Sequence, residues 1–394
     1  MLAALQFCPA LAAGQDNGEP VKFFATRYTT STDQLRQRFA RESGATLQSP
    51  VDYVIRKFQD HDIVLLGEAH GWAHNTDFLQ ALLPRLHAAG IGFAFEPINA
   101  RNQAELDKLL TASRFDEESA NFLLLDTGFN YVGYRDVLHA AWKLNQSLLP
   151  KAPRFRITAI DESDMATVKD WSQLRPGEKA RDPQVRERMI AALRQGDSRD
   201  QLWMQIIDRD FIRKGVKAVV YAGAMHTSTS FLIERGWDGV QGHHRTVGNM
   251  LYDYIGSRAF TVLLHEGSRY RTQMVEDLLG DSRSKQFGID LKSSLLGAVP
   301  SLTDGYVPMQ RRGGPEGYTL SDLADGYIYL TPRRQWLVSP PIKGIYDGPR
   351  NLRLVQERMR LSAGDRNLKV NVAELEAADV RNAQHYQYLT NGDW

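Results

Sequence analysis

The chain has 394 residues, of which 42% are hydrophobic and 24% are charged. This composition excludes a mostly disordered or collagen-like chain, and the length suits one large α/β domain or two ordinary ones. The net charge of +1 gives no general attraction to nucleic acids or acidic membranes. The single cysteine, Cys8, excludes an intramolecular disulfide and a zinc–thiolate cluster.

The first 14 residues are apolar and end in small side chains. Ala10-Leu11-Ala12 fits the A-x-A cleavage pattern of signal peptides, although no basic residue precedes the apolar run. We therefore expect residues 1–14 to be a truncated signal segment and the protein to be periplasmic or secreted. The alternative is a packed N-terminal segment of a cytoplasmic protein. No later apolar run reaches 18 residues, so no transmembrane helix is predicted.

Short apolar runs alternate with amphipathic segments from about residue 50 onwards. The runs are typical of strands buried on both faces, and we predict five, at residues 62–66, 91–95, 154–160, 217–222 and 259–264. Apolar residues at helical spacing predict helices at about 52–59, 76–89, 100–110, 134–145, 183–194 and 200–214. Strands that alternate with helices predict an α/β fold with a mostly parallel central sheet flanked by helices.

The pattern changes at about residue 266, where glycine and serine become frequent and the strand–helix alternation lapses. We predict a catalytic or binding α/β domain at residues 15–269. Residues 270–394 are then an irregular C-terminal extension that packs on this domain or covers its site. An independent second domain is the alternative for the extension.

Several predicted strands end in acidic or imidazole side chains. Glu68 and His70 follow the first strand, Glu96 follows the second, and His226 follows the fourth. Because ligands of open parallel sheets bind beyond the carboxyl ends of the strands, we predict that these four side chains form one polar site. Gly67 and Gly223 each precede a histidine by three residues, where a sharp turn or a close backbone approach favours glycine. The secondary candidates near the same site are His74, Asp161, Glu162, Arg186 and Arg188.

These residue types support three kinds of chemistry. His70, Glu96 and His226 suit a divalent metal that activates water. Without a metal, the same groups suit a histidine general base that a carboxylate holds in one tautomer. A tyrosine of the aromatic cluster that follows Gly128 offers a haem ligand. The chain contains no G-x-G-x-x-G, Walker or Gly-x-Ser-x-Gly motif, so the sequence gives no support for nucleotide binding or a serine nucleophile.

Three segments carry a family resemblance: Val64-Leu-Leu-Gly-Glu-Ala-His70, Phe93-Ala-Phe-Glu96 and Val219-Val-Tyr-Ala-Gly-Ala-Met-His226. Residues 60–267 resemble ChaN-like members of the Tiki/TraB/erythromycin-esterase superfamily. The resemblance implies one of several functions. Tiki-type proteins are metal-dependent peptidases, with motifs that match His70, Glu96 and His226. Erythromycin esterases activate water with a histidine and no metal, and have one residue more between the first glutamate and histidine. ChaN proteins bind haem.

We therefore predict a hydrolase of peptide, ester or amide bonds acting on a small-molecule or peptide substrate. In this hypothesis His70 activates water and Glu68 orients it or shares a metal. Glu96 is a ligand or general base, and His226 is a second ligand or stabilises the oxyanion. The alternatives are a protein that binds haem or iron without turnover, and a secreted effector that binds a partner.

Overall fold

A computed structural model gives the structure of the protein. It describes residues 32–43, 47–161, 199–229, 231–234, 243–244, 246–267, 269–280, 282, 285–300, 309–311, 319–363 and 367–391. The predicted helix at 183–194 and the predicted signal segment lie outside these residues.

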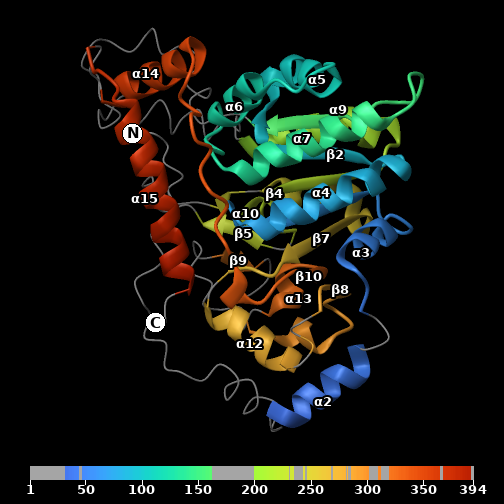
Figure 1. Ribbon diagram of the computed structural model, residues 1–394. Helices are drawn as coiled ribbons and strands as arrows, with labels where there is room; N and C mark the ends of the chain where they lie inside the picture. The colour runs from blue at the N-terminus through green and yellow to red at the C-terminus, as the bar shows by residue number, and fades with distance from the viewer. Residues whose placement is uncertain are drawn as a thin grey trace.

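The centre of the structure is a seven-stranded sheet with the order β3-β2-β4-β1-β7-β10-β8 (Figure 1). Its strands are β1 (Ile63–Glu68), β2 (Gly92–Asn99), β3 (Ile157–Asp161), β4 (Ala218–Gly223), β7 (Ala259–Leu264), β8 (Phe287–Asp290) and β10 (Gly326–Tyr329). Neighbouring strands run parallel, except that β8 is antiparallel to β10. The predicted α/β fold with a mostly parallel sheet is thus confirmed. A small antiparallel sheet contains β5 (Phe231–Glu234), β6 (His243–His244) and β9 (Met309–Arg311).

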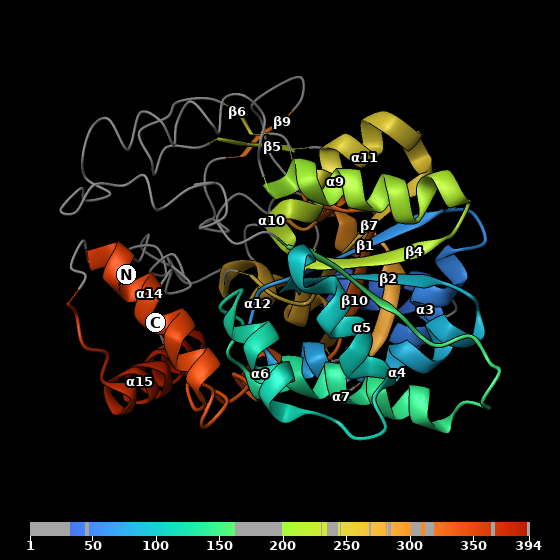
Figure 2. The same ribbon diagram turned by 90° about the horizontal axis from the view of Figure 1, so that it is seen from above.

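The strands are buried on both faces because successive side chains point into two different helix layers. Val64 and Phe93 enter one core, whereas their neighbours Leu65 and Ala94 enter the other. Figure 2 shows the sheet between these layers. One layer contains α3 (Pro50–Lys57), α4 (Ala73–Ala88), α5 (Gln103–Thr111), α6 (Glu117–Leu125) and α7 (Val132–Ser147). The other contains α9 (Arg199–Asp210) and α11 (Val247–Ile255).

The remaining elements lie around this framework. The other α-helices are α2 (Thr32–Ser43), α10 (Ala224–Thr227), α12 (Arg269–Leu279), α13 (Leu320–Leu323), α14 (Pro349–Ala363) and α15 (Val372–Asn391). Short 3₁₀ helices are η1 (Ala100–Asn102), η3 (Ile212–Lys214), η4 (Gly256–Arg258), η6 (Leu295–Ala298) and η7 (Arg333–Gln335). Helices α2 and α12 share a third core with β8 and β10.

The central sheet continues past the domain boundary predicted at residue 269. Strands β8 and β10 both come from the segment expected to be an irregular extension, yet β10 pairs with β7. Each of the two strands has only four residues, which is too short to stand out as an apolar run. Before β10, this segment also contributes α12, η6 and α13 beside the sheet and β9 to the small sheet, and the stretch after β10 contains η7, α14 and α15.

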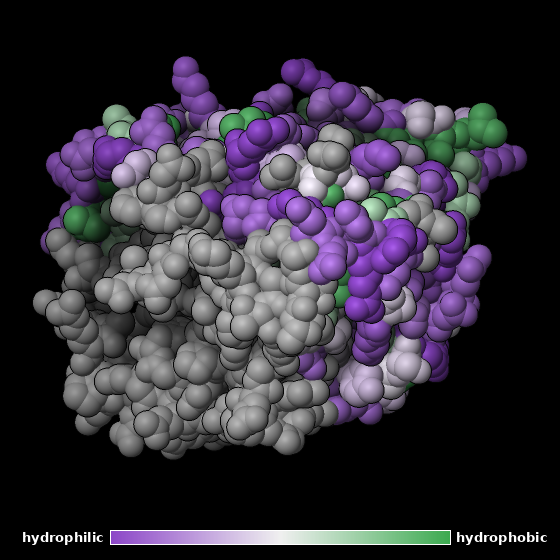
Figure 3. All heavy atoms as spheres, turned by 90° about the horizontal axis from the view of Figure 1, so that it is seen from below, coloured by the Kyte–Doolittle hydropathy of each residue, from purple (hydrophilic) through white to green (hydrophobic). Residues whose placement is uncertain are grey.

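The surface of the described part is mostly hydrophilic. In the view of Figure 3, hydrophobic groups are scattered among polar ones over the coloured face. Leu149 and Leu337 are among the few large hydrophobic residues that are exposed. Among the described helices, none combines the length and the hydropathy that a membrane span requires.

Candidate active site

Glu68, at the end of β1, is buried and accepts hydrogen bonds from three side chains. Its Oε1 accepts from the Tyr134 hydroxyl at 2.7 Å and from His70 Nδ1 at 2.9 Å, and its Oε2 accepts from the Tyr221 hydroxyl. The Tyr134 hydroxyl in turn accepts from the Gly71 amide at 3.0 Å, so its own proton is directed to Glu68. Glu68 therefore acts as an acceptor that orients the His70 imidazole through Nδ1.

The Nε2 atom of His70 points to β2 and lies 3.9 Å from Glu96 Oε1. Burial alone lowers the pKa of this imidazole, but the charge of Glu96 and the hydrogen bond to Glu68 outweigh burial and raise the pKa of His70 to about 9. The edge of the Phe129 ring packs against the imidazole, with ring centroids 4.9 Å apart. His70 is therefore a proton donor at neutral pH.

Glu96 lies in β2 and is buried next to the guanidinium of Arg199, the first residue of α9. Its Oε1 accepts from Arg199 Nη2 at 2.8 Å, and its Oε2 accepts from the Gly223 amide at 2.6 Å. Burial raises the pKa of Glu96, but the charges of His70 and Arg199 prevail and lower it below its ordinary value. Arg199 Nε also lies 3.4 Å from Asp161 Oδ1 at the end of β3.

His226, in the short helix α10, is oriented by a buried carboxylate. Its Nδ1 lies 2.9 Å and 3.0 Å from the two oxygens of Asp200, and the Val247 amide donates to Asp200 Oδ1 at 2.8 Å. Its Nε2 lies 3.2 Å from Arg199 Nη2. A guanidinium only donates hydrogen bonds, so Nε2 must accept and Nδ1 must carry the proton. Nε2 of His226 is therefore the acceptor nitrogen, and Nδ1 donates to Asp200.

Gly223 brings the two histidines together at the end of β4. A Cβ atom at this position would lie 3.0 Å from His70 Nε2 and 3.5 Å from His226 Cδ2. Both imidazoles thus lie beside one backbone atom, and a side chain here would displace His70. Gly67 is required for a similar reason, because a Cβ atom here would meet Thr227 Oγ1 and would lie 3.0 Å from the Cα of Ala224. Gly67 thus allows close packing of β1 against α10, and Gly223 leaves room for the two imidazoles.

Three further residues belong to the site although the sequence patterns did not single them out as candidates. Arg199 and Asp200 start a helix, far from any strand end, and only the packing of α9 across the sheet brings them to His226. Glu266 follows β7, so the strand-end argument applied to the fifth predicted strand would have found it. It is buried, and its two oxygens accept from the Ala69 amide and the Asn75 side chain.

The secondary candidates have different positions. Asp161 joins the site through Arg199. His74 lies in the first turn of α4, but its ring packs between Trp72 and Trp336, with centroid distances of 6.0 Å and 5.8 Å. Burial and the neighbouring His265 lower the pKa of His74 to about 3. The candidates Glu162, Arg186 and Arg188 lie outside the described residues.

The predicted metal ligands do not fit a metal in this arrangement. His226 Nε2 accepts from Arg199, and both oxygens of Glu96 accept from Arg199 and the Gly223 amide. The guanidinium thus supplies the positive charge that a divalent ion would bring to these groups. Within the described part of the chain, histidines, cysteines and carboxylates form no group of three or more that is placed to hold a metal ion.

The tyrosine cluster does not provide a haem ligand at Tyr134. This side chain is fully buried, and its hydroxyl is hydrogen-bonded to both Glu68 and the Gly71 amide. Ligation of haem iron requires an accessible phenolate. Tyr134 instead orients Glu68.

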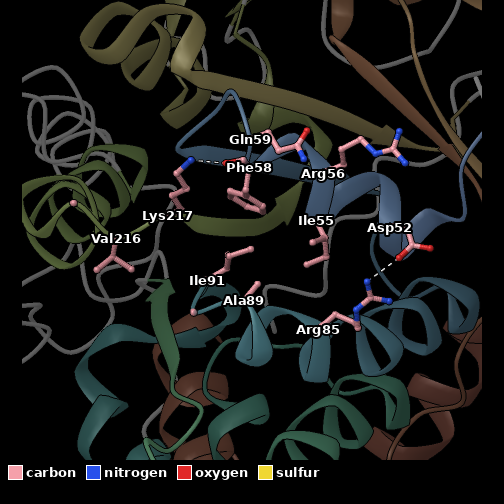
Figure 4. A pocket seen from close by; sticks show the side chains of 12 residues that line it. Asp52, Ile55, Arg56, Phe58, Gln59, Arg85, Ala89, Ile91, Val216 and Lys217 are labelled. Carbon is pink, nitrogen blue, oxygen red and sulfur yellow. Dashed lines mark hydrogen bonds and ion pairs between the residues drawn. The ribbon is translucent and has the colours of Figure 1, made fainter.

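A hollow of about 720 Å³ lies at the opposite, amino end of the strands (Figure 4). Its basic residues complement the carboxyl ends of neighbouring helices, where the backbone carbonyls favour cations. Lys217 donates to the Phe58 carbonyl, and Arg85 pairs with Asp52 at 2.8 Å. The candidate residues all lie at the other end of the sheet, so we assign a structural role to this hollow.

No family model and no curated protein sequence matches the chain. Among solved structures, the chain is similar to a protein from Bacillus cereus, with 13% identity and a TM-score of 0.49 over 76% of this chain and 97% of that one. It is also similar to an erythromycin esterase mutant in its open conformation, with 12% identity and a TM-score of 0.47 over 71% and 92% of the two chains. A third similar structure is haem-bound ChaN of Campylobacter jejuni, with 17% identity and a TM-score of 0.29 over 55% and 86%. Erythromycin esterases and ChaN proteins are also the groups that the sequence motifs resemble. Likeness at this level concerns the fold, so the function has to be argued from the site itself.

The raised pKa values at the site predict how stability depends on pH. In the folded protein the pKa of His70 is about 9, against 6.5 ordinarily, and that of Glu266 is raised by burial and the charge of Glu68 to about 8, against 4.5. Both groups retain a proton that the unfolded chain releases at lower pH. The stability that these two protons contribute is therefore complete at a pH below the pKa values of the unfolded chain. It is lost as the pH rises through the pKa values of the folded protein.

We expect the free energy of unfolding to fall as the pH is raised from 6.5 to 9. The variant Glu266→Gln removes one of the two titrating groups, so its decline between pH 4.5 and 8 should be shallower. Urea unfolding at constant ionic strength measures both curves. A stability that stays level or rises over this range would contradict the assignment of protons to His70 and Glu266.

Proposed function

We propose that the protein is a hydrolase of peptide, ester or amide bonds in which His226 activates water and His70 protonates the leaving group. One observation carries the proposal: two imidazoles beside Gly223 present their Nε2 atoms to groups of opposite charge, His226 to the guanidinium of Arg199 and His70 to the carboxylate of Glu96. His226 accepts from a guanidinium, whereas His70 donates to Glu68 and has a pKa of about 9. Adjacent titratable groups with opposed environments are the usual arrangement of an acid–base pair.

The reaction follows from the positions of these groups. In this reaction a water molecule takes the place of Arg199 at His226 Nε2, which accepts a hydrogen bond from that guanidinium at 3.2 Å in the structure. The water gives a proton to Nε2 as its oxygen bonds to the carbonyl carbon, and Asp200 stabilises the imidazolium. Arg199 stabilises the oxyanion. The carbon–heteroatom bond then breaks as His70 Nε2 gives its proton to the leaving group.

This assignment differs from the roles that the sequence suggested, in which His70 activates water and His226 is a second ligand or stabilises the oxyanion. Glu68, the acidic group paired with His70, is buried with three donors and keeps the imidazole protonated. Asp200 instead accepts from Nδ1 of His226 and so leaves Nε2 as the basic nitrogen. The local hydrogen bonds therefore favour His226 as the base.

The proposal is tested by assaying the purified protein on p-nitrophenyl acetate, a macrocyclic lactone and a peptide p-nitroanilide, with and without EDTA. We expect turnover of at least one probe, unchanged by EDTA. Arg199→Ala should lower kcat by about 10²–10³-fold, because it removes an oxyanion donor. Arg209→Ala is the matched control, since Arg209 lies on the same helix and pairs with Asp210 at the surface.

Three outcomes count against the proposal. Activity that EDTA abolishes and zinc restores would assign the water to a metal. A Soret band with no turnover would favour the haem-binding alternative. Equal rates for Arg199→Ala and Arg209→Ala would remove Arg199 from the reaction.

A further inference from the structure

Residues 336–342, here called the strap, connect η7 to the chain that leads into α14 (the orange-red trace in Figure 1). The strap pairs with two loops in an antiparallel manner, at Trp72 with Val338 and at Tyr131 with Pro341. The first loop carries His70, and the second leads from Phe129 into α7. The strap therefore contacts both segments that surround the Glu68–His70 pair.

The strap supplies the N-terminal caps of helices α4 and α7. Both helices begin after an aromatic residue, Trp72 or Tyr131, and in the described structure neither side chain makes a capping hydrogen bond. An uncapped helix start leaves backbone amides without partners. The strap satisfies them from a distant part of the chain: Ala73 donates to the Leu337 carbonyl at 2.9 Å, Val132 to the Pro340 carbonyl at 2.9 Å, and Gly133 to Ser339 Oγ at 2.8 Å.

Ser339 is the residue that joins the two helices. It is buried, its amide donates to the Gly71 carbonyl at 2.7 Å, and its hydroxyl accepts from Gly133. Gly71 is the residue after His70. Gly133 precedes Tyr134, whose hydroxyl donates to Glu68. One residue of the C-terminal region thus contacts both segments that lead to the Glu68–His70 pair, Gly71 through its amide and Gly133 through its hydroxyl.

We infer that the strap, through Ser339, is a positioning element that sets the orientation of the Glu68–His70 pair. The inference rests on the proposed function for its catalytic consequence, but the state of His70 is measurable without any substrate. The strap is held in turn by Gln387 of α15, whose side chain accepts from the Val338 amide at 2.6 Å and donates to the Trp336 carbonyl at 2.7 Å. Residues at the end of the chain therefore act on the site through the strap.

The test follows the imidazole of His70 by NMR in full-length protein labelled with ¹³C-histidine, with the signal assigned by His70→Gln. We expect Ser339→Ala to lower the titration midpoint of His70 from about 9 to below about 8, because the Gly133 amide loses its cap and Tyr134 moves from Glu68. On any probe that is hydrolysed, kcat should fall by about 10–100-fold with KM within about twofold. Leu337→Ala is the matched control, because its side chain is 63% exposed and only its carbonyl contacts α4.

Gln387→Ala also tests whether the strap positions His70, and it replaces Ser339→Ala if that variant does not fold. It should shift the His70 titration in the same direction by a smaller amount. Variants that fold with an unchanged His70 titration would overturn the inference. A shifted titration in a protein that hydrolyses no probe would uphold the strap's role and count against the proposed function alone.

Discussion

Replacing His226 by alanine is expected to lower kcat by about 10²–10⁴-fold, the usual contribution of a general base. Asp200→Asn should have an effect of similar size although the imidazole remains. The amide of asparagine would donate to Nδ1, so the proton would move to Nε2, which could then no longer take a proton from water. The measurement is the steady-state rate on whichever aryl ester, lactone or anilide the wild-type protein hydrolyses.

The double variant distinguishes a base and its orienting group from two independent residues. Groups that act as one unit are strongly non-additive, so His226→Ala/Asp200→Asn should be no slower than the slower single variant. If the kcat of the double variant falls by the product of the two single effects, Asp200 acts on something other than His226. His87→Gln is the control. His87 lies at the end of α4, away from the site, and its side chain forms a hydrogen bond with the Pro153 carbonyl.

The sequence predicts the part of the fold in which local pattern and tertiary environment agree. The five long apolar runs became β1, β2, β3, β4 and β7, each buried on both faces. The four-residue strands β8 and β10 carry no such pattern. Gly326 and Gly288 lie against the side chain of Tyr53 there, so glycine serves close packing at positions where strand propensity would favour a β-branched residue.

The same distinction applies to the site. Glu68, His70, Glu96 and His226 were predictable because the carboxyl ends of parallel strands meet at one edge. Arg199 and Asp200 were not, because their place depends on the direction in which α9 crosses the sheet. Their arrival changes the chemistry, since a guanidinium now lies where the residue types alone suggested a metal. Residue types define a set of candidate reactions, and the proposed function rests on the hydrogen-bond partners that favour one of them.

Replacing Glu68 by alanine is expected to destabilise the protein by about 3–5 kcal/mol, the usual cost of removing one partner from a buried charged pair. The change would leave the protonated His70 without its carboxylate and would deprive the hydroxyls of Tyr134 and Tyr221 of their acceptor. Chemical unfolding followed by circular dichroism measures the loss. Tyr221→Phe removes one of the three donors and should cost about 1–2 kcal/mol.

The isosteric variant Glu68→Gln separates the charge of Glu68 from its volume. The amide fills the same space, and its oxygen still accepts from Tyr134 or His70, so most of the stability should return. The negative charge that helps to hold the proton on His70 is lost, however, so the pKa of His70 should fall from about 9 and the imidazole should become neutral at a lower pH. Leaving-group protonation would then weaken while the base His226 stays intact. A Glu68→Gln variant in which His70 titrates as in the wild type would show that Glu96 alone holds the proton, and that Glu68 serves only to pack the end of β1.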